Sequence, residues 1–124
     1  MTHYSALTVH QINKHYQDGS RQIDVIRDLS FNVAAGKSIS VTGPSGSGKS
    51  TLLNALAGLV ELDDGDITLE IEDRIFSYRA ANERARTAFR RQHIGYVYQF
   101  FNLVPTLTVL ENVRLPARLN RRPD

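Results

Sequence analysis

Residues 38–59, SISVTGPSGSGKSTLLNALAGL, combine three local patterns in a fixed order. Residues 39–42 alternate apolar and small polar side chains, which predicts a short strand. Residues 43–50, GPSGSGKS, fit the pattern G-x-x-x-x-G-K-[ST], and the leucines that follow recur at helical spacing as far as Val60. Strand, glycine-rich loop and helix in this order are the context that a phosphate-binding P-loop requires.

The residue types in this loop suit the binding of phosphates and a metal ion. Backbone N–H groups that point into one concavity attract anions, and the start of the helix adds the positive end of its dipole. Lys49 can place its ammonium on the β- and γ-phosphates of a nucleotide, and the Ser50 hydroxyl can ligate Mg²⁺, which prefers oxygen. The predicted nucleotide-binding residues of the loop are Gly43, Ser45, Gly46, Ser47, Gly48, Lys49, Ser50 and Thr51. The alternative is a glycine-rich turn that only joins a strand to a helix.

Composition argues against several kinds of site and partner. Apolar residues make up 41% of the chain and charged residues 23%, the proportions of an ordinary soluble domain. The formal charge of +2 and the lack of a dense basic stripe argue against a nucleic-acid partner. Without cysteine the chain has neither disulfides nor thiolate metal sites, and its four histidines lack ligand-like spacing with carboxylates. We therefore expect the histidines to have surface or structural roles.

Alternating apolar residues predict three further strands. The odd positions of residues 23–33 are mostly apolar, residues 7–9 indicate an earlier strand, and residues 67–71 alternate again. A turn is predicted at residues 16–20, between the first two strands. The acidic stretch 63–66, DDGD, is interpreted as an Asp/Gly turn in preference to a metal site.

The last third of the chain predicts two helices and one strand. Residues 81–91 form a helical pattern whose basic face is interpreted as solvated surface. Residues 93–99, HIGYVYQ, are a candidate for a short buried strand. After a loop that contains Pro105, Thr108 and Glu111 have the spacing that opens a helix.

Two motifs give the chain a family resemblance. GPSGSGKSTLLNALAGL, residues 43–59, is similar to the Walker A motif of ATP-binding-cassette (ABC) ATPases, and HIGYVYQFFNLVPTLTVLENVRLP, residues 93–116, is similar to their Q-loop. The chain thus resembles the N-terminal half of an ABC transporter ATPase subunit, of the lipoprotein-release and macrolide-export type. The resemblance implies an α/β P-loop NTPase fold, here an antiparallel β-subdomain plus part of the parallel core sheet with the P-loop helix. It also implies that residues 1–124 form one incomplete nucleotide-binding domain, without a second domain.

The resemblance assigns roles to residues outside the loop. Tyr16 lies where the family has an aromatic side chain that stacks on adenine, and the alternative is a tyrosine packed at a strand end. Gln99 matches the glutamine that senses Mg²⁺ and the attacking water, and the alternative is a polar strand end. Gln99 is therefore a candidate catalytic residue together with Lys49, and a candidate metal ligand together with Ser50. Residues 100–113 resemble the surface that docks a transmembrane subunit, and the alternative for the phenylalanines at its start is ordinary core packing.

Three motifs of the family are absent from these 124 residues: an L-S-G-G-Q-type signature, a Walker B strand that ends in Asp-Glu, and a later histidine. Without the Walker B acids no strong candidate polarises the attacking water, so we expect the chain alone to lack ATP turnover. We also expect unpaired strand edges and exposed apolar surface. A second chain, a homo-oligomer or the remainder of a longer protein would cover them.

The implied function is the ATP-binding part of an ABC transporter ATPase that couples ATP binding and hydrolysis to export or extraction at a membrane. Its ligands would be ATP and Mg²⁺, and the complete domain would form a homodimer. It would contact a transmembrane subunit from the cytoplasmic side, peripheral to the inner face of the cell membrane. The alternatives are an ATP- or phosphate-binding fragment without turnover, a different P-loop enzyme such as a kinase or a GTPase, and a cassette ATPase that acts on DNA or ribosomes. No D-x-x-G follows the loop as a GTPase would require, and NLVPTLTVLENV, residues 102–113, resembles the transporter branch.

Overall fold

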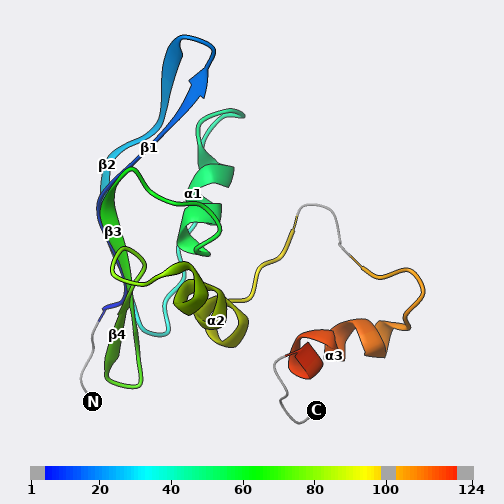
Figure 1. The fold of residues 1–124 in the computed structure, drawn as a ribbon. Helices are drawn as coiled ribbons and strands as arrows, with labels where there is room; N and C mark the ends of the chain where they lie inside the picture. The colour runs from blue at the N-terminus through cyan, green and yellow to red at the C-terminus, as the bar shows by residue number, and fades with distance from the viewer. Residues whose placement is uncertain (1–4, 99–102, 120–124) are drawn as a thin grey trace.

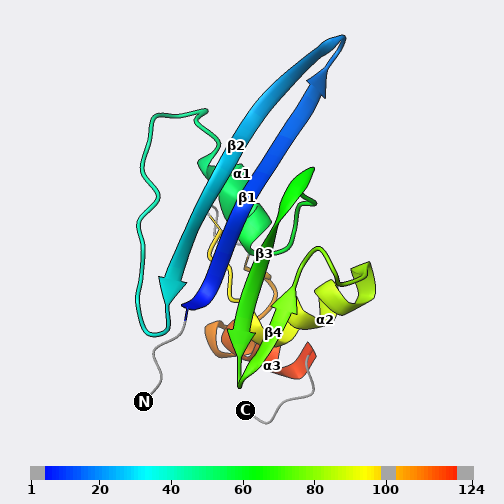
Figure 2. The ribbon, with the colours of Figure 1, turned by 90° about the vertical axis from the view of Figure 1, so that its left-hand side faces the viewer.

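The computed structural model describes residues 5–98 and 103–119. Four antiparallel strands form one sheet in the order β2-β1-β3-β4. Their bounds are β1 Ser5–Asp18, β2 Arg21–Ala34, β3 Asp64–Ile71 and β4 Arg74–Ser77. The helices are α1 Lys49–Leu56, α2 Glu83–His93 and α3 Val109–Leu119. Helices α1 and α2 cover one face of the sheet (Figure 1, Figure 2), and α3 lies apart from it (Figure 1).

Strands β1 and β2 form a long twisted hairpin whose tip extends past α1 (Figure 1, Figure 2). The apolar residues at odd positions of β2 are half-buried towards its end, as the alternation predicts. The predicted turn is shorter than residues 16–20, because β1 continues to Asp18 and only Gly19 and Ser20 connect the strands. Several register shifts interrupt the pairing of β1 with β2, and each adds a local bend to the hairpin.

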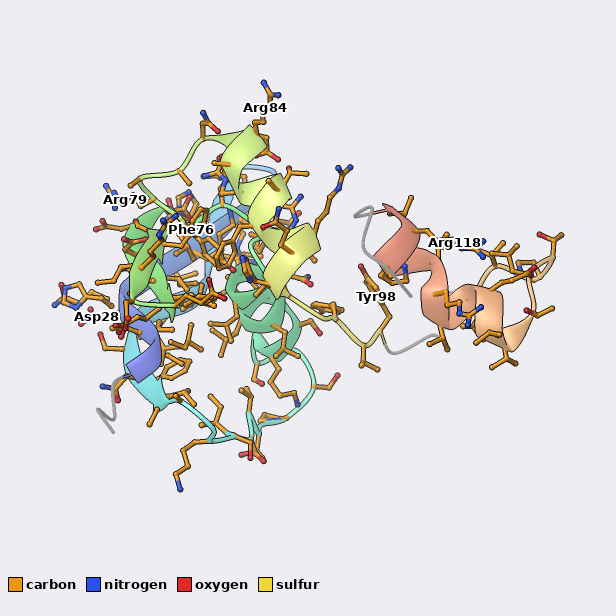
Figure 3. All side chains as sticks on the ribbon, turned by 90° about the horizontal axis from the view of Figure 1, so that it is seen from below. Asp28, Phe76, Arg79, Arg84, Tyr98 and Arg118 are labelled. Atoms are coloured by element: carbon orange, nitrogen blue, oxygen red, sulfur yellow. The ribbon has the colours of Figure 1, made fainter. Side chains whose placement is uncertain are left out.

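The hydrophobic core lies between the sheet and helices α1 and α2. Each element contributes a few side chains: Val9 and Ile12 from β1, Ile26 from β2, Ile67 from β3, Leu52 and Ala55 from α1, and Phe89 from α2, with Tyr78 after β4. Phe76 of β4 stacks on Phe89 with ring centroids 4.0 Å apart, and Figure 3 shows Phe76 between the sheet and α2. This packing orients α1, and with it the loop that precedes α1.

Local capping sets where the helices begin. Asn82 caps α2 by accepting a hydrogen bond from the Ala85 N–H at 2.8 Å, so the predicted helix 81–91 is displaced to residues 83–93. The Thr108 hydroxyl accepts from the Glu111 N–H at 3.1 Å, and the Glu111 carboxylate accepts from the Thr108 N–H at 2.7 Å. This reciprocal capping box confirms the predicted start of α3.

The two segments predicted as strands of a parallel sheet are not strands in this structure. Residues 37–44 and 94–98 have no strand pairing, although Tyr96 donates a hydrogen bond to the side chain of Asn54 on α1 at 2.8 Å. A strand needs a neighbour for its N–H and C=O groups, and within the described ranges no segment pairs with either one. Ile94 still packs against the core, whereas Val97 in the same segment is 97% exposed.

The prediction of a turn at residues 63–66 is wrong, because β3 already begins at Asp64. Gly65 has φ +83° and lies against the backbone of β1, so the glycine serves a close approach of two strands. The rejected alternative of a metal site gains no support. The described part of the chain contains no cluster of three or more His, Cys, Asp or Glu residues able to hold a metal ion.

Candidate phosphate-binding site

The glycine-rich loop leads directly into α1, and both Gly46 and Gly48 have positive φ. Gly46 has φ +81°, and a Cβ at this position would meet no atom within 4 Å, so the loop is open there. Gly48 has φ +96° and is the N-cap of α1. A Cβ at Gly48 would lie 2.9 Å from the carbonyl oxygen of Val25, so only glycine lets the loop approach β2 this closely.

Lys49 is the first residue of α1, and its ammonium lies across the loop that precedes it. It donates hydrogen bonds to the carbonyl oxygens of Gly43 and Pro44, the latter at 3.3 Å. The Ser47 N–H donates to the Pro44 carbonyl at 3.2 Å, which closes the loop into a turn. The cation and the N-terminal end of α1 therefore lie at the same place, the arrangement that attracts an anion.

A groove of about 350 Å³ lies between this loop and β2. It is lined by Val25, Ile26, Arg27, Leu29, Val41, Thr42, Gly43, Pro44, Ser47, Gly48, Lys49 and Leu52. The charged groups in this lining are the cations of Arg27 and Lys49, and none of the described lining residues carries a carboxylate. The charges of the groove favour an anionic ligand.

The hydroxyl groups at the start of α1 belong to Ser50 and Thr51. Ser50 is exposed and Thr51 is half-buried, one and two residues after Lys49. An exposed hydroxyl beside a phosphate-attracting loop suits Mg²⁺, a hard cation that takes oxygen ligands and keeps several waters. Of the two predicted metal ligands, the structure describes only Ser50. Gln99 lies outside the described residues.

Tyr16 lies on the same hairpin as the residues that contact the loop. It pairs with Ile23 on β2, two residues from Val25, which approaches Gly48. The tyrosine is 43% exposed and lies two residues before the end of β1. The ammonium of Lys14 lies 5.1 Å from the centre of its ring, a cation–π distance.

Sequence reasoning missed two sets of polar contacts, one beside Tyr16 on β1 and the other after the C-terminal end of α1. Asp63 binds His15, the residue before Tyr16, across 48 positions of sequence. At the other end, Tyr78 donates to the Leu56 carbonyl at 2.7 Å and Arg90 donates to the Gly58 carbonyl at 2.8 Å. The Leu56 carbonyl belongs to the last residue of α1 and the Gly58 carbonyl lies two residues beyond it, where the helix supplies no further N–H donors.

Burial raises the pKa of the Tyr78 hydroxyl to about 12, with a smaller opposing effect from the Arg90 charge.

Among the described residues, no helix is both long enough and apolar enough to cross a membrane.

Comparison with known proteins identifies the family. The family model described as ABC transporter matches residues 26–123. An uncharacterized ABC transporter ATP-binding protein of Mycobacterium tuberculosis is 44% identical over 104 residues, which are 84% of this chain and 40% of that protein. The lipoprotein-releasing system ATP-binding protein LolD of Hydrogenovibrio crunogenus is 41% identical over 118 residues, 95% of this chain and 50% of that protein.

A solved structure with the same fold is the ATP-binding cassette MJ0796, a dimer in a post-hydrolysis state bound to ADP and Pi. It has a TM-score of 0.81 and 35% sequence identity, and the match covers 95% of this chain and 49% of that one. This likeness confirms the predicted α/β P-loop NTPase fold. The chain spans about half the length of the curated relatives it matches. From the matched family model and these relatives, the chain belongs to the ABC transporter family of ATP-binding proteins.

Proposed function

We propose that residues 43–51 bind the phosphates of Mg·ATP and that Lys49 is their main cation. The observation that carries this proposal is the position of the Lys49 ammonium, across the glycine loop at the start of α1. The groove beside it has two cations and no carboxylate among its described lining residues. Backbone N–H groups, the helix dipole and the ammonium together favour a polyphosphate.

Binding requires a local exchange of hydrogen bonds. Lys49 satisfies its ammonium with the carbonyls of Gly43 and Pro44, so it must leave these acceptors to pair with a phosphate. The exchange is favourable because a phosphate oxygen carries a formal negative charge that attracts the ammonium, whereas a carbonyl oxygen carries only a partial charge. Ser50 would supply the hydroxyl ligand of Mg²⁺, whose chemistry when bound is to neutralise charge on the β- and γ-phosphates.

We assign the adenine to Tyr16 and the sensing of the attacking water to Gln99. Support for Tyr16 comes from its half-exposed ring and from its place on the hairpin that contacts the loop at Gly48. The assignment of Gln99 rests on the sequence motif alone. With Lys49 it makes up the proposed catalytic residues, and with Ser50 the proposed metal ligands.

The wider function is proposed from the relatives. LolD proteins are named as ATP-binding proteins of a lipoprotein-releasing system. We propose that the protein containing this chain couples ATP binding and hydrolysis to export or extraction of a lipophilic substrate or peptide. It would act as a homodimer on the inner face of the cell membrane, where the region around residues 100–113 contacts a transmembrane subunit. The dimeric state of the cassette MJ0796 supports the homodimer.

Calorimetric titration of the chain with Mg·ATP tests the phosphate site. Lys49→Ala should abolish binding or weaken it severely, because the phosphates lose their main cation. Lys37→Ala is the matched control, since it removes an exposed lysine from the segment that leads to the same loop and should leave the affinity unchanged. Unchanged affinity in Lys49→Ala would contradict the assignment of the loop.

A further inference from the structure

Asp63 connects the end of the α1 region to β1 immediately before Tyr16. One carboxylate oxygen of Asp63 accepts a hydrogen bond from the backbone N–H of His15 at 2.6 Å and lies 2.8 Å from the ring Nδ1 of the same residue, within ion-pair distance. The backbone N–H of Asp63 donates to the carbonyl of Asn13 at 2.9 Å. Asp63 thus bonds β1 at two alternate residues, as a neighbouring strand would.

This contact lies where β1 loses its second neighbour. The pairing of β1 with β3 ends at Asn13 and Asp64, and beyond that point β1 pairs with β2 alone. The register of β1 with β2 also shifts twice between Ile12 and His15. A two-stranded ribbon with irregular pairing is marginally stable by itself, so the Asp63–His15 contact and the approach of Val25 to Gly48 connect this end of the hairpin to the rest of the fold.

Tyr16 is the first residue beyond the contact, and its ring is available on one face. Lys14, on the other side of His15, places its ammonium 5.1 Å from the ring centre. A cation over one face of the ring leaves the opposite face for a flat, apolar partner such as a purine base. The direction of that face depends on the backbone at His15, which Asp63 fixes.

We propose that Asp63 is a positioning residue for the base of the nucleotide: by contacting both the backbone and the ring of His15 it orients the Tyr16 ring for stacking. This inference rests on the proposed Mg·ATP site and extends it to a residue between α1 and β3. The hydrogen bonds of Asp63 go to His15 and Asn13, and Asp63 does not line the groove beside the glycine loop. Its effect should therefore be confined to the base and should not extend to the phosphates.

Comparison of ATP with inorganic tripolyphosphate separates binding of the base from binding of the phosphates. ATP carries a base and inorganic tripolyphosphate does not, whereas both carry the phosphates that Lys49 would bind. Asp63→Ala should weaken Mg·ATP binding by about fivefold, the lower limit for loss of a base–aromatic stack, and leave tripolyphosphate affinity unchanged. Asp63→Asn keeps a side-chain oxygen that can accept from the His15 backbone N–H, so it should retain most of the ATP affinity.

The matched control is Asp64→Ala. It removes the neighbouring carboxylate, which binds Arg79 at 3.2 Å and has no hydrogen bond to His15, so both affinities should stay unchanged. In a Tyr16→Ala background, Asp63→Ala should cause no further loss of ATP affinity, because the ring that it orients is gone. Each titration is made by calorimetry on the full 124-residue chain, with circular dichroism to check that every variant is folded.

Three results would overturn the inference. Asp63→Ala could leave ATP affinity intact, it could weaken ATP and tripolyphosphate equally, or its effect could persist without Tyr16. None of these depends on the result for the phosphate site. If Lys49→Ala binds ATP normally, the proposed function fails regardless of Asp63. If only Lys49→Ala behaves as expected, the phosphate site stands and the role of Asp63 is refuted.

Discussion

Replacement of Gly65 by alanine should break the junction between β1 and β3. Gly65 has φ +83°, and a Cβ there would overlap the carbonyl oxygen of Gln11 and lie 2.5 Å from that of His10. Alanine in this left-handed conformation costs about 1–2 kcal/mol. Displacement of β3 would also remove one or two ladder hydrogen bonds at about 0.5–1.5 kcal/mol each. Gly65→Ala should therefore lower the free energy of unfolding by about 1.5–5 kcal/mol.

Urea unfolding followed by circular dichroism measures this loss. Gly36→Ala is the matched control, because Gly36 has φ +78° and a Cβ there would meet no atom within 4 Å. The control should lose only the cost of the backbone conformation, about 1–2 kcal/mol. Equal losses in the two variants would show that the approach of β3 to β1 contributes nothing, and would refute the reasoning.

Three other changes test separate contacts. Tyr16→Ala should weaken Mg·ATP binding by roughly 1–3 kcal/mol; a loss of folding stability with affinity intact in the folded fraction would favour a packing role. Tyr78→Phe should lower the free energy of unfolding by about 1 kcal/mol, because the Leu56 carbonyl loses its donor; no change in urea unfolding would contradict this. Since burial raises the pKa of Tyr78 from 10.0 to about 12, the stability due to its neutral hydroxyl should be present below pH 10 and lost as the pH rises towards about 12, a loss that should vanish in Tyr78→Phe. Thr108→Ala should reduce the helicity of α3 by removing a cap of about 1 kcal/mol, whereas Thr106→Ala should leave the circular dichroism spectrum unchanged.

Local patterns predicted the elements whose cause is local. The alternation in residues 23–33 indicates β2, and the odd apolar positions from Val25 to Val33 are half-buried while Ile23 is exposed. The spacing of Thr108 and Glu111 predicts the capping box because both partners are three residues apart. The loop 43–50 specifies its own turn through glycines that tolerate positive φ.

The features that sequence reasoning missed depend on residues far apart in the chain. Asp63 and Gly65 were interpreted as turn residues, but their roles come from β1, which lies about 50 positions earlier. Residues 39–42 and 94–98 have strand patterns without strand structure, because pairing needs a neighbour that the described residues do not supply. Propensity alone states what a segment can form, and contacts decide whether it does.

Amide hydrogen exchange locates the nucleotide most directly. Addition of Mg·ATP should slow exchange in residues 43–51 and at the β1–β2 hairpin tip of the wild-type chain, and Lys49→Ala should remove this protection. A separate pocket of about 340 Å³, lined in part by Tyr78, Arg86 and Arg90, is the alternative place where the nucleotide could slow exchange. Protection confined to that pocket, with residues 43–51 unchanged, would contradict the assignment of the loop as the phosphate site.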